Sequence, residues 1–340
     1  MRLLSWLLWG SGCGVDELAR RLDTDARELR RFRPRYREFT IPKRSGGRRR
    51  ILAPDDELKR LQRRILRRLL GRLRAHPAAH GFERGRSIVT NALPHRGRDA
   101  VVRLDLVDFF PSTRAARIRR YFRRIGWNRA ATRILVRLCT HEGRLPQGAP
   151  TSPRLSNLVN YRLDARLAGI AAALGAVYTR YADDLTFSFA RADDLDGDSP
   201  LDRHPGTGRP LPLDTTGTLR ELLPTLRDRV RYVGSFTARV VGEEGYRLHL
   251  RRKSSVRRRH HRQIVTGLVV NERPNLPRAT RRWLRAVEHR ARLAEQPRLD
   301  SDGSVDYGRR KQPTLTPTQL EGWRAFRAMI AAQAGPASRR

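Results

Sequence analysis

Two adjacent carboxylates, Asp183 and Asp184, stand between two short apolar and aromatic runs of the sequence. The runs, residues 177–181 and 185–189, have the composition of strands, so the pair would lie at the tip of a hairpin. Two like charges about 4 Å apart repel by roughly 4 kcal/mol at an effective dielectric constant of about 20. A hard cation such as Mg²⁺, which prefers oxygen ligands, would relieve that repulsion. The residues are equally compatible with an ordinary β-turn, in which Asp is frequent.

A third carboxylate, Asp105, interrupts the apolar run 101–106, which has the pattern of a buried strand. A charge in a core strand needs a partner or a metal ion. If this strand lies beside the hairpin, Asp105, Asp183 and Asp184 converge. Three carboxylates can hold two Mg²⁺ ions, or Mn²⁺ in their place, which is the arrangement that catalyses phosphoryl transfer on a nucleotide.

Four segments of the chain, in this order, resemble the sequence boxes of reverse transcriptases. They are residues 39–54 (FTIPKRSGGRRRILAP), 105–110 (DLVDFF), 145–157 (LPQGAPTSPRLSN) and 181–184 (YADD). The resemblance implies an RNA-directed DNA polymerase, which is a nucleotidyltransferase. It also implies an α+β right-hand fold with fingers, a palm built on a ferredoxin-like antiparallel sheet with helices, and a small helical thumb. Asp105, Asp183 and Asp184 would be catalytic and would bind the metal ions together with the backbone carbonyl of Leu106.

The same resemblance implies a nucleotide site. Its residues would be Lys43, Arg49, Phe110, Gln147, Gly148 and Lys253. Cations on a glycine-containing hairpin can lie along a triphosphate, and the sequence leaves the choice between Arg49 and Arg50 open. A ring at Phe110 would lie under the sugar and exclude a 2′-hydroxyl, although Phe109 and Phe110 would also suit a core.

Two further segments resemble retron-type reverse transcriptases: residues 91–95 (NALPH), an NAxxH pattern, and residues 265–267 (VTG). With the basic run 257–262 they give a set of candidate RNA contacts: Asn91, His95, Arg257, Arg258, Arg259, Val265, Thr266 and Gly267. His95 could also be an ordinary polar residue near a helix end. The basic run could also be a solvated loop.

A retron-type enzyme implies several partners. It would copy part of its own structured non-coding RNA into single-stranded DNA from dNTPs, priming from an RNA 2′-hydroxyl. It would act in antiviral defence, together with an effector protein. The alternatives are another bacterial reverse transcriptase, of the group II intron or abortive-infection type, or a catalytically silent RNA-binding scaffold.

Composition agrees with a nucleic-acid partner. The chain has 340 residues, a formal net charge of +38 and a sequence pI of about 11.7, which favours a polyanion. Nearly all of its cations are arginine, a bias that a GC-rich genome also produces. Two cysteines make no disulfide framework, and no stretch reaches the roughly 20 apolar residues of a membrane span. We therefore expect a cytoplasmic protein that does not bind a membrane.

The patterns divide the chain into expected domains: an N-terminal helical segment (1–38), fingers (39–99), a palm (100–262) and a thumb (263–340). Within the palm range, residues 113–140 would form junction helices, and the Asp-, Gly- and Pro-rich stretch 191–216 would be a loop insertion. Apolar spacing predicts single helices over residues 15–32, 55–74, 219–233 and 277–293. Another helix would start at the cap residue Ser152 and continue to Leu167, and a last one would follow a capping box formed by Thr316 and Gln319.

Overall fold

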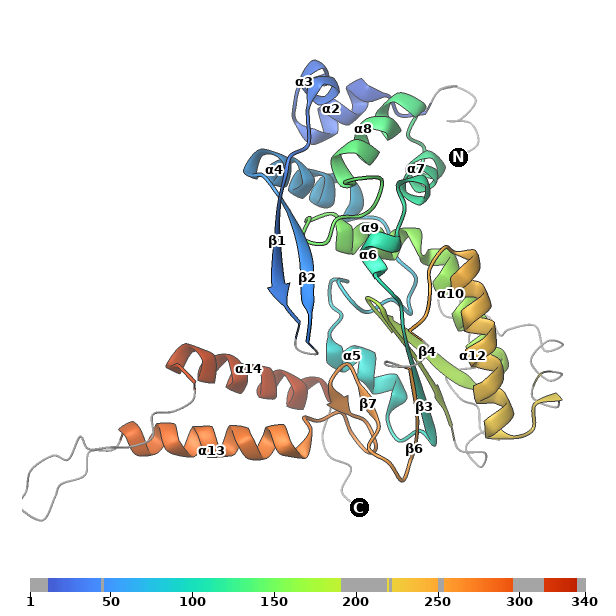
Figure 1. Cartoon of the computed structure of the whole chain (residues 1–340), viewed down its shortest axis with the longest axis vertical. Helices are drawn as coiled ribbons and strands as arrows, with labels where there is room; N and C mark the ends of the chain where they lie inside the picture. Colours follow the sequence, from blue (N-terminus) through green and yellow to red (C-terminus); the bar gives the residue numbers. More distant parts are fainter. Residues whose placement is uncertain are drawn as a thin grey trace, which may run out of the picture.

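The computed structural model describes residues 12–43, 46–190, 219, 222–249, 254–295 and 315–334 of the chain. Lys253 and the predicted insertion 191–216 lie outside the described residues. The described part is a mixed helix and sheet fold centred on a four-stranded antiparallel sheet (Figure 1). None of the described helices combines the length and the apolar character needed to cross a membrane.

The central sheet has the strand order β4-β5-β3-β6. The strands are β4 (Ala176–Tyr181), β5 (Asp184–Phe189), β3 (Ala100–Asp105) and β6 (Ser255–Arg258). Because side chains alternate along a strand, the even positions of β3 point to one face. There Val102 and Leu104 share a core with α10 (Tyr161–Ala173) and α12 (Leu226–Glu243).

The odd positions of β3 point to the opposite face, here called the site face because Asp105 lies on it. At its far end Val101 packs against α5 (Ile88–Ala92), the β7–β8 hairpin and α14 (Pro317–Ala334). The hairpin consists of β7 (Ile264–Val265) and β8 (Leu268–Val269). The 3₁₀ turn η2 (Leu93–His95) follows α5 directly.

A second group of helices, here called the upper helical group, has its own core (Figure 1). It contains α2 (Val15–Leu22), α3 (Ala26–Arg31), α4 (Asp56–Arg64), η1 (Ile65–Leu70), α7 (Ala115–Arg124), α8 (Arg129–Cys139) and α9 (Ser152–Val159). The short helix α6 (Phe109–Ser112) joins β3 to it. The ribbon of β1 (Tyr36–Pro42) and β2 (Arg48–Pro54) reaches from this group towards α5 and α14 (Figure 1).

Three predicted helices have other boundaries. The helix expected over residues 15–32 is two helices, because Asp23 adopts the left-handed conformation (φ 55°) and Asp25 caps α3 by accepting hydrogen bonds from two backbone amides. The helix expected over 219–233 instead runs from Leu226 to Glu243 behind the cap residue Thr225. The helix expected to start behind Ser152 and run on to Leu167 begins at Ser152 and breaks at Asn160, between α9 and α10.

The C-terminal helices follow the predicted pattern. Helix α13 (Arg278–Glu295) and α14 pack through a small core that contains Leu284, Val287 and Leu320. Thr316 and Gln319 form the predicted capping box, since each side chain accepts a hydrogen bond from the other residue's backbone amide.

Candidate active site

The sheet register brings the predicted carboxylates together at the backbone. Asp105, the last residue of β3, is the direct partner of Asp184, the first residue of β5. Side chains of directly opposed residues on one face lie about 4.5–5.5 Å apart at their Cβ atoms. Asp183 is in the adjoining turn, and its carbonyl oxygen accepts a 3.0 Å hydrogen bond from the backbone amide of Leu106. The predicted adjacency of the two strands is therefore confirmed.

A guanidinium group and an imidazole lie beside two of these carboxylates. A guanidinium nitrogen of Arg103, two residues before Asp105 on the same face, is 3.2 Å from Oδ1 of Asp184. His249 Nε2 is 3.7 Å from Oδ1 of Asp105, which is only 3% exposed. Among the described residues no group of three His, Cys, Asp or Glu side chains is positioned to hold a metal ion. The ions thus remain a prediction.

The turn that carries Asp183 is held from below by a buried ion pair. Ala182 adopts a left-handed backbone (φ 57°), which costs a non-glycine residue about 1–3 kcal/mol. A guanidinium nitrogen of Arg180 donates to the carbonyl oxygen of Ala182 at 3.1 Å. Arg180 also makes two 2.7 Å hydrogen bonds to the carboxylate of Asp164, and both side chains are fully buried.

The surroundings of Arg180 keep its guanidinium group charged. Burial disfavours the charged form of Arg180, but the adjacent Asp164 carboxylate outweighs that effect and raises the pKa of Arg180 above its usual value. Burial, together with Asp164, likewise raises the pKa of Tyr178, whose hydroxyl donates to Asp164 at 2.9 Å. The carbonyl oxygen of Ala182 in this turn therefore accepts a hydrogen bond from a side chain that stays positively charged.

Asn157 extends the same network to the loop before α5. Its side-chain oxygen accepts from Arg180 at 3.0 Å, and its nitrogen donates to the carbonyl oxygen of Gly81 at 2.7 Å. A Cβ atom added to Gly81 would lie 2.7 Å from the amide nitrogen of Ala182, so only glycine fits there. Sequence reasoning missed Arg180, although a charge inside an apolar strand was the same signal that singled out Asp105.

The β1–β2 ribbon separates the three arginines that the sequence left undistinguished. Arg50 is bound to Glu38 on the neighbouring strand at 2.7 Å, and Arg48 donates to Thr40. Alternation places Arg49 on the other face of the ribbon, where it is exposed without a carboxylate partner among the described residues. This arrangement favours Arg49 over Arg50 as a phosphate contact.

Gly148 and Gln147 are placed against the ribbon. The carbonyl oxygen of Gln147 accepts from the amide of Leu52 at 2.8 Å. A Cβ added to Gly148 would lie 2.9 Å from the carbonyl oxygen of Leu52, and its φ is +124°. Close packing therefore already requires glycine here, independently of any nucleotide, and the nucleotide contact of this segment stays a prediction.

An aromatic group borders the carboxylates. Phe110 is half-buried, and its ring centroid lies 6.0 Å from that of Phe82. Phe82 also lies 6.5 Å from the ring of Tyr181 and is 47% exposed. Its left-handed backbone (φ 64°) aims this ring outward from the loop after Gly81. Sequence reasoning missed Phe82, because its unusual backbone conformation has no local signature in a bulky residue.

Three predicted RNA contacts are buried, so the structure corrects their assignment. Asn91, His95 and Val265 are each 0% exposed. His95 packs against strands β4 and β5 of the sheet. Its two ring nitrogens are 2.7 Å from Ser188 Oγ and 2.8 Å from Thr179 Oγ1. Burial lowers the pKa of His95 to about 3, so the imidazole is neutral. These residues hold the framework and cannot touch RNA in this structure.

Thr266 and Gly267 form the tip of the β7–β8 hairpin. Both have positive φ, 45° and 84°, as a two-residue hairpin turn of type I′ requires. Thr266 Oγ1 donates to the carbonyl oxygen of Ile88 in α5 at 3.0 Å. The hairpin tip thus contacts the first residue of α5, the helix in which the segment 91–95 begins, and Gly267 is exposed at this junction.

The basic run after β6 is divided between the two faces of the sheet. Arg257 pairs with Val101 and so lies on the site face, whereas Arg258 pairs with Ala100 and lines a hollow on the opposite face with α12. Arg259 follows the strand and is exposed. Arg258 therefore faces away from Arg257, and the RNA contacts of these three arginines stay predictions.

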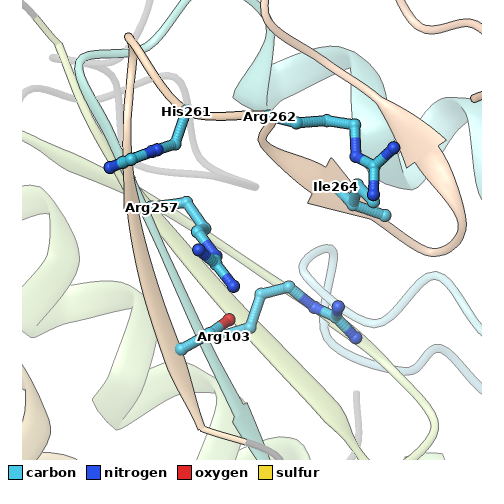
Figure 2. A pocket seen from close by; sticks show the side chains of 6 residues that line it. Arg103, Arg257, His261, Arg262 and Ile264 are labelled. Atoms are coloured by element: carbon cyan, nitrogen blue, oxygen red, sulfur yellow. The ribbon is translucent and has the colours of Figure 1, made fainter.

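A basic pocket of about 400 Å³ lies on the site face (Figure 2). Its lining residues are Arg103, Ser255, Arg257, His261, Arg262 and Ile264. Gln263 anchors the loop that carries three of them by donating to the carbonyl oxygens of Arg98 (2.9 Å) and Arg257 (3.1 Å). Since Arg103 also contacts Asp184, the pocket adjoins the carboxylates, and its chemistry suits phosphate groups.

Comparison with known proteins identifies the relatives of the chain. Residues 41–204 match the family described as reverse transcriptase (RNA-dependent DNA polymerase). The chain is 40% identical over 307 residues to the retron Mx65 reverse transcriptase of Myxococcus xanthus, which covers 84% of this chain and 62% of the relative. It is 43% identical over 156 residues to the retron Ec86 reverse transcriptase of Escherichia coli, which covers 45% of this chain.

The relatives are longer than the matched region. The chain covers 62% of the Mx65 protein, 52% of the retron Mx162 reverse transcriptase of Myxococcus xanthus and 49% of the Ec86 protein. The similarity therefore extends over most of this chain but over less than two thirds of each relative.

Proposed function

We propose that this chain, whose residues 41–204 match the reverse transcriptase family, is an RNA-directed DNA polymerase. The observation that carries the proposal is the register that sets Asp105 opposite Asp184, with Asp183 in the adjoining turn. In the proposed reaction a strand-terminal hydroxyl attacks the α-phosphate of a dNTP, a new phosphodiester bond forms, and pyrophosphate leaves.

The donor set fits divalent metal ions. Carboxylate and carbonyl oxygens are the ligands that Mg²⁺ prefers, and Asp105, Asp183, Asp184 and the carbonyl of Leu106 would hold it. Arg103 lies beside Asp184 in the structure, so at least this carboxylate has a positively charged partner before any ion binds. When bound, the ions would activate the attacking hydroxyl and stabilise the leaving oxygen.

The other side chains have binding roles in this proposal. Lys43 and Arg49 on the β1–β2 ribbon would bind the triphosphate, and Gln147 would contact the nucleotide or the template. The buried network of Arg180, Asp164 and Asn157 fixes the turn, so that Asp183 and Asp184 keep their orientation. The pocket around Arg257 would hold backbone phosphates of the RNA.

The retron type is the finer part of the proposal. Its support is the similarity to retron reverse transcriptases together with the contact between α5 and the Thr266–Gly267 tip. We propose that the chain copies part of a structured non-coding RNA from a 2′-hydroxyl primer in the cytoplasm, in antiviral defence with an effector protein. A silent RNA-binding scaffold is disfavoured because all three aspartates are present.

Replacement of Phe110 tests the sugar contact. Phe110→Ala should open space for a 2′-hydroxyl, so the efficiency of ribonucleotide incorporation relative to dNTP incorporation should rise by about tenfold or more. The measurement is the ratio of kcat/KM values for the two nucleotides. Phe82→Ala, which removes the neighbouring exposed ring, should leave the ratio near wild type. An unchanged ratio for Phe110→Ala would reduce that residue to a core ring.

Two groups of substitutions separate general RNA binding from recognition of one RNA. Arg257→Gln with Arg259→Gln should weaken binding to every RNA and flatten its salt dependence by about 0.7 log units per lost contact on single strands. Arg258→Gln, on the other face of the sheet, is the matched control. Thr266→Val should reduce initiation on the cognate RNA and spare extension of a generic annealed primer, because phosphate contacts carry no sequence information.

These outcomes are read by running both substrates with every variant. Equal loss on the two substrates for Thr266→Val would make the hairpin tip ordinary framework, and the retron-specific part of the proposal would fall. The polymerase itself is tested by primer extension on an RNA template. Absence of extension by the wild-type protein would reject it.

A further inference from the structure

A second basic pocket lies in the upper helical group, on helices that the proposed reaction does not use. It has a volume of about 440 Å³ and is lined by Arg119 and Arg123 of α7, and by Arg129, Thr132 and Arg133 of α8. In each helix the two arginines are four residues apart, a spacing that places both on one face. Two helices therefore direct four guanidinium groups at one hollow.

The pocket stands on a rigid base. Ile118 and Phe122 on the inner face of α7 are 0% exposed, as are Ala131 and Leu135 of α8. Trp127, in the connection between the helices, is buried with them in the same core. Its carbonyl oxygen accepts from Arg123 at 3.1 Å and from Thr132 at 3.3 Å. The core thus fixes the distance between the two pairs of arginines.

Two other arginines on the same helices have hydrogen-bond partners within the protein. Arg117 of α7 is bound to Glu244 at 2.8 Å, and Arg137 of α8 donates to the carbonyl oxygen of Leu29 at 2.6 Å. Within the described residues, none of the four pocket arginines is paired with a carboxylate, and all four are exposed. Clustered like charges repel, so this arrangement calls for an anion from outside the chain.

We propose that this α7–α8 pocket binds the backbone phosphates of a base-paired segment of RNA that lies outside the catalytic region. Guanidinium groups bind phosphates in a bidentate manner, and the lining contains no aromatic ring on which unpaired bases would stack. Figure 1 places α7 and α8 away from the strands that carry Asp105 and Asp184, with α6 and α9 between them. The inference rests on the proposed function in one respect: the proposed function is the reason for choosing RNA as the polyanion.

The test compares two quadruple variants of the full chain. The pocket variant carries Arg119→Gln, Arg123→Gln, Arg129→Gln and Arg133→Gln. The control carries Arg27→Gln, Arg30→Gln, Arg31→Gln and Arg33→Gln, which removes the same charge from exposed positions in and just after α3. Affinity is measured across a salt series for an RNA hairpin with a stem of about 16 base pairs, the span of a double-stranded RNA-binding domain. A DNA hairpin of the same sequence and polyglutamate serve as comparison ligands, and thermal unfolding checks the fold.

The pocket variant should bind the RNA hairpin about tenfold or more weakly than wild type, with a salt dependence shallower by up to about 0.9 log units per lost contact. It should still extend a short primer–template normally, and the control should bind the hairpin nearly as well as wild type. Equal affinity in all three proteins would overturn the inference and leave the polymerase proposal intact. Equal loss in both variants, a greater loss for DNA, or a loss confined to polyglutamate would also overturn it. Failure of the wild-type protein to bind any RNA would reject both proposals.

Discussion

Asp183→Asn should reduce DNA synthesis by at least about 10²–10³-fold while leaving RNA binding nearly unchanged. The substitution keeps the size of the side chain but removes the charge that would bind a divalent ion. Loss of one preorganised group that stabilises transition-state charge typically costs about that factor, and a ligand shared by two ions should cost no less. Asp105→Asn should have an effect of the same size, because its strand register places it in the same site.

Asp108→Asn is the matched control for this prediction. Asp108 lies three residues after Asp105 and has a left-handed backbone (φ 46°) that asparagine tolerates well. Its side chain does not cap α6, and synthesis should stay within a few-fold of wild type. The measurement is the rate of single-turnover primer extension at saturating dNTP. If Asp183→Asn retains activity within about tenfold of wild type, the assignment of the aspartates is wrong.

Arg180→Met should destabilise the protein strongly and nearly abolish synthesis. Removing one partner of a buried ion pair costs about 3–5 kcal/mol, because the carboxylate of Asp164 would remain buried without its cation. The carbonyl oxygen of Ala182 would lose its donor at the same time. The free energy of unfolding, measured by denaturant titration, should fall by that amount.

The double variant Arg180→Met with Asp164→Leu separates folding from positioning. Replacing both charges with apolar groups can be nearly neutral for stability, so the double variant should recover much of the lost free energy of unfolding. Synthesis should stay low, because the carbonyl oxygen of Ala182 would still lack the donor that Arg180 provides. Recovery of wild-type synthesis in the stable double variant would show that the pair serves folding alone.

The sequence predicted that Asp105 and the turn at Asp183 and Asp184 come together, because the signal of these carboxylates is local and unusual. A charge inside an apolar run is costly unless the fold uses it, and this argument located Asp105 and the turn at Asp183. The same reasoning applied to Arg180 would have found the buried network.

The sequence did not predict which residues of the short motifs are buried. Asn91, His95 and Val265 belong to segments with a clear resemblance, but the resemblance does not distinguish a residue that contacts RNA from one that supports the contact. The packing of α5 against the sheet and the β7–β8 hairpin decides this, and it joins residues more than a hundred positions apart. The predicted helix boundaries were wrong for a different reason. The break at Asp23, for example, depends on a single residue in the left-handed conformation.

Template-directed addition of a single nucleotide tests the central claim most directly. The wild-type protein is given a primer annealed to RNA, a divalent metal ion and one labelled dNTP at a time. The account predicts that only the dNTP complementary to the next RNA base extends the primer, and that Asp183→Asn gives no product under the same conditions. Absence of extension, or addition of any dNTP without regard to the RNA base, would contradict it.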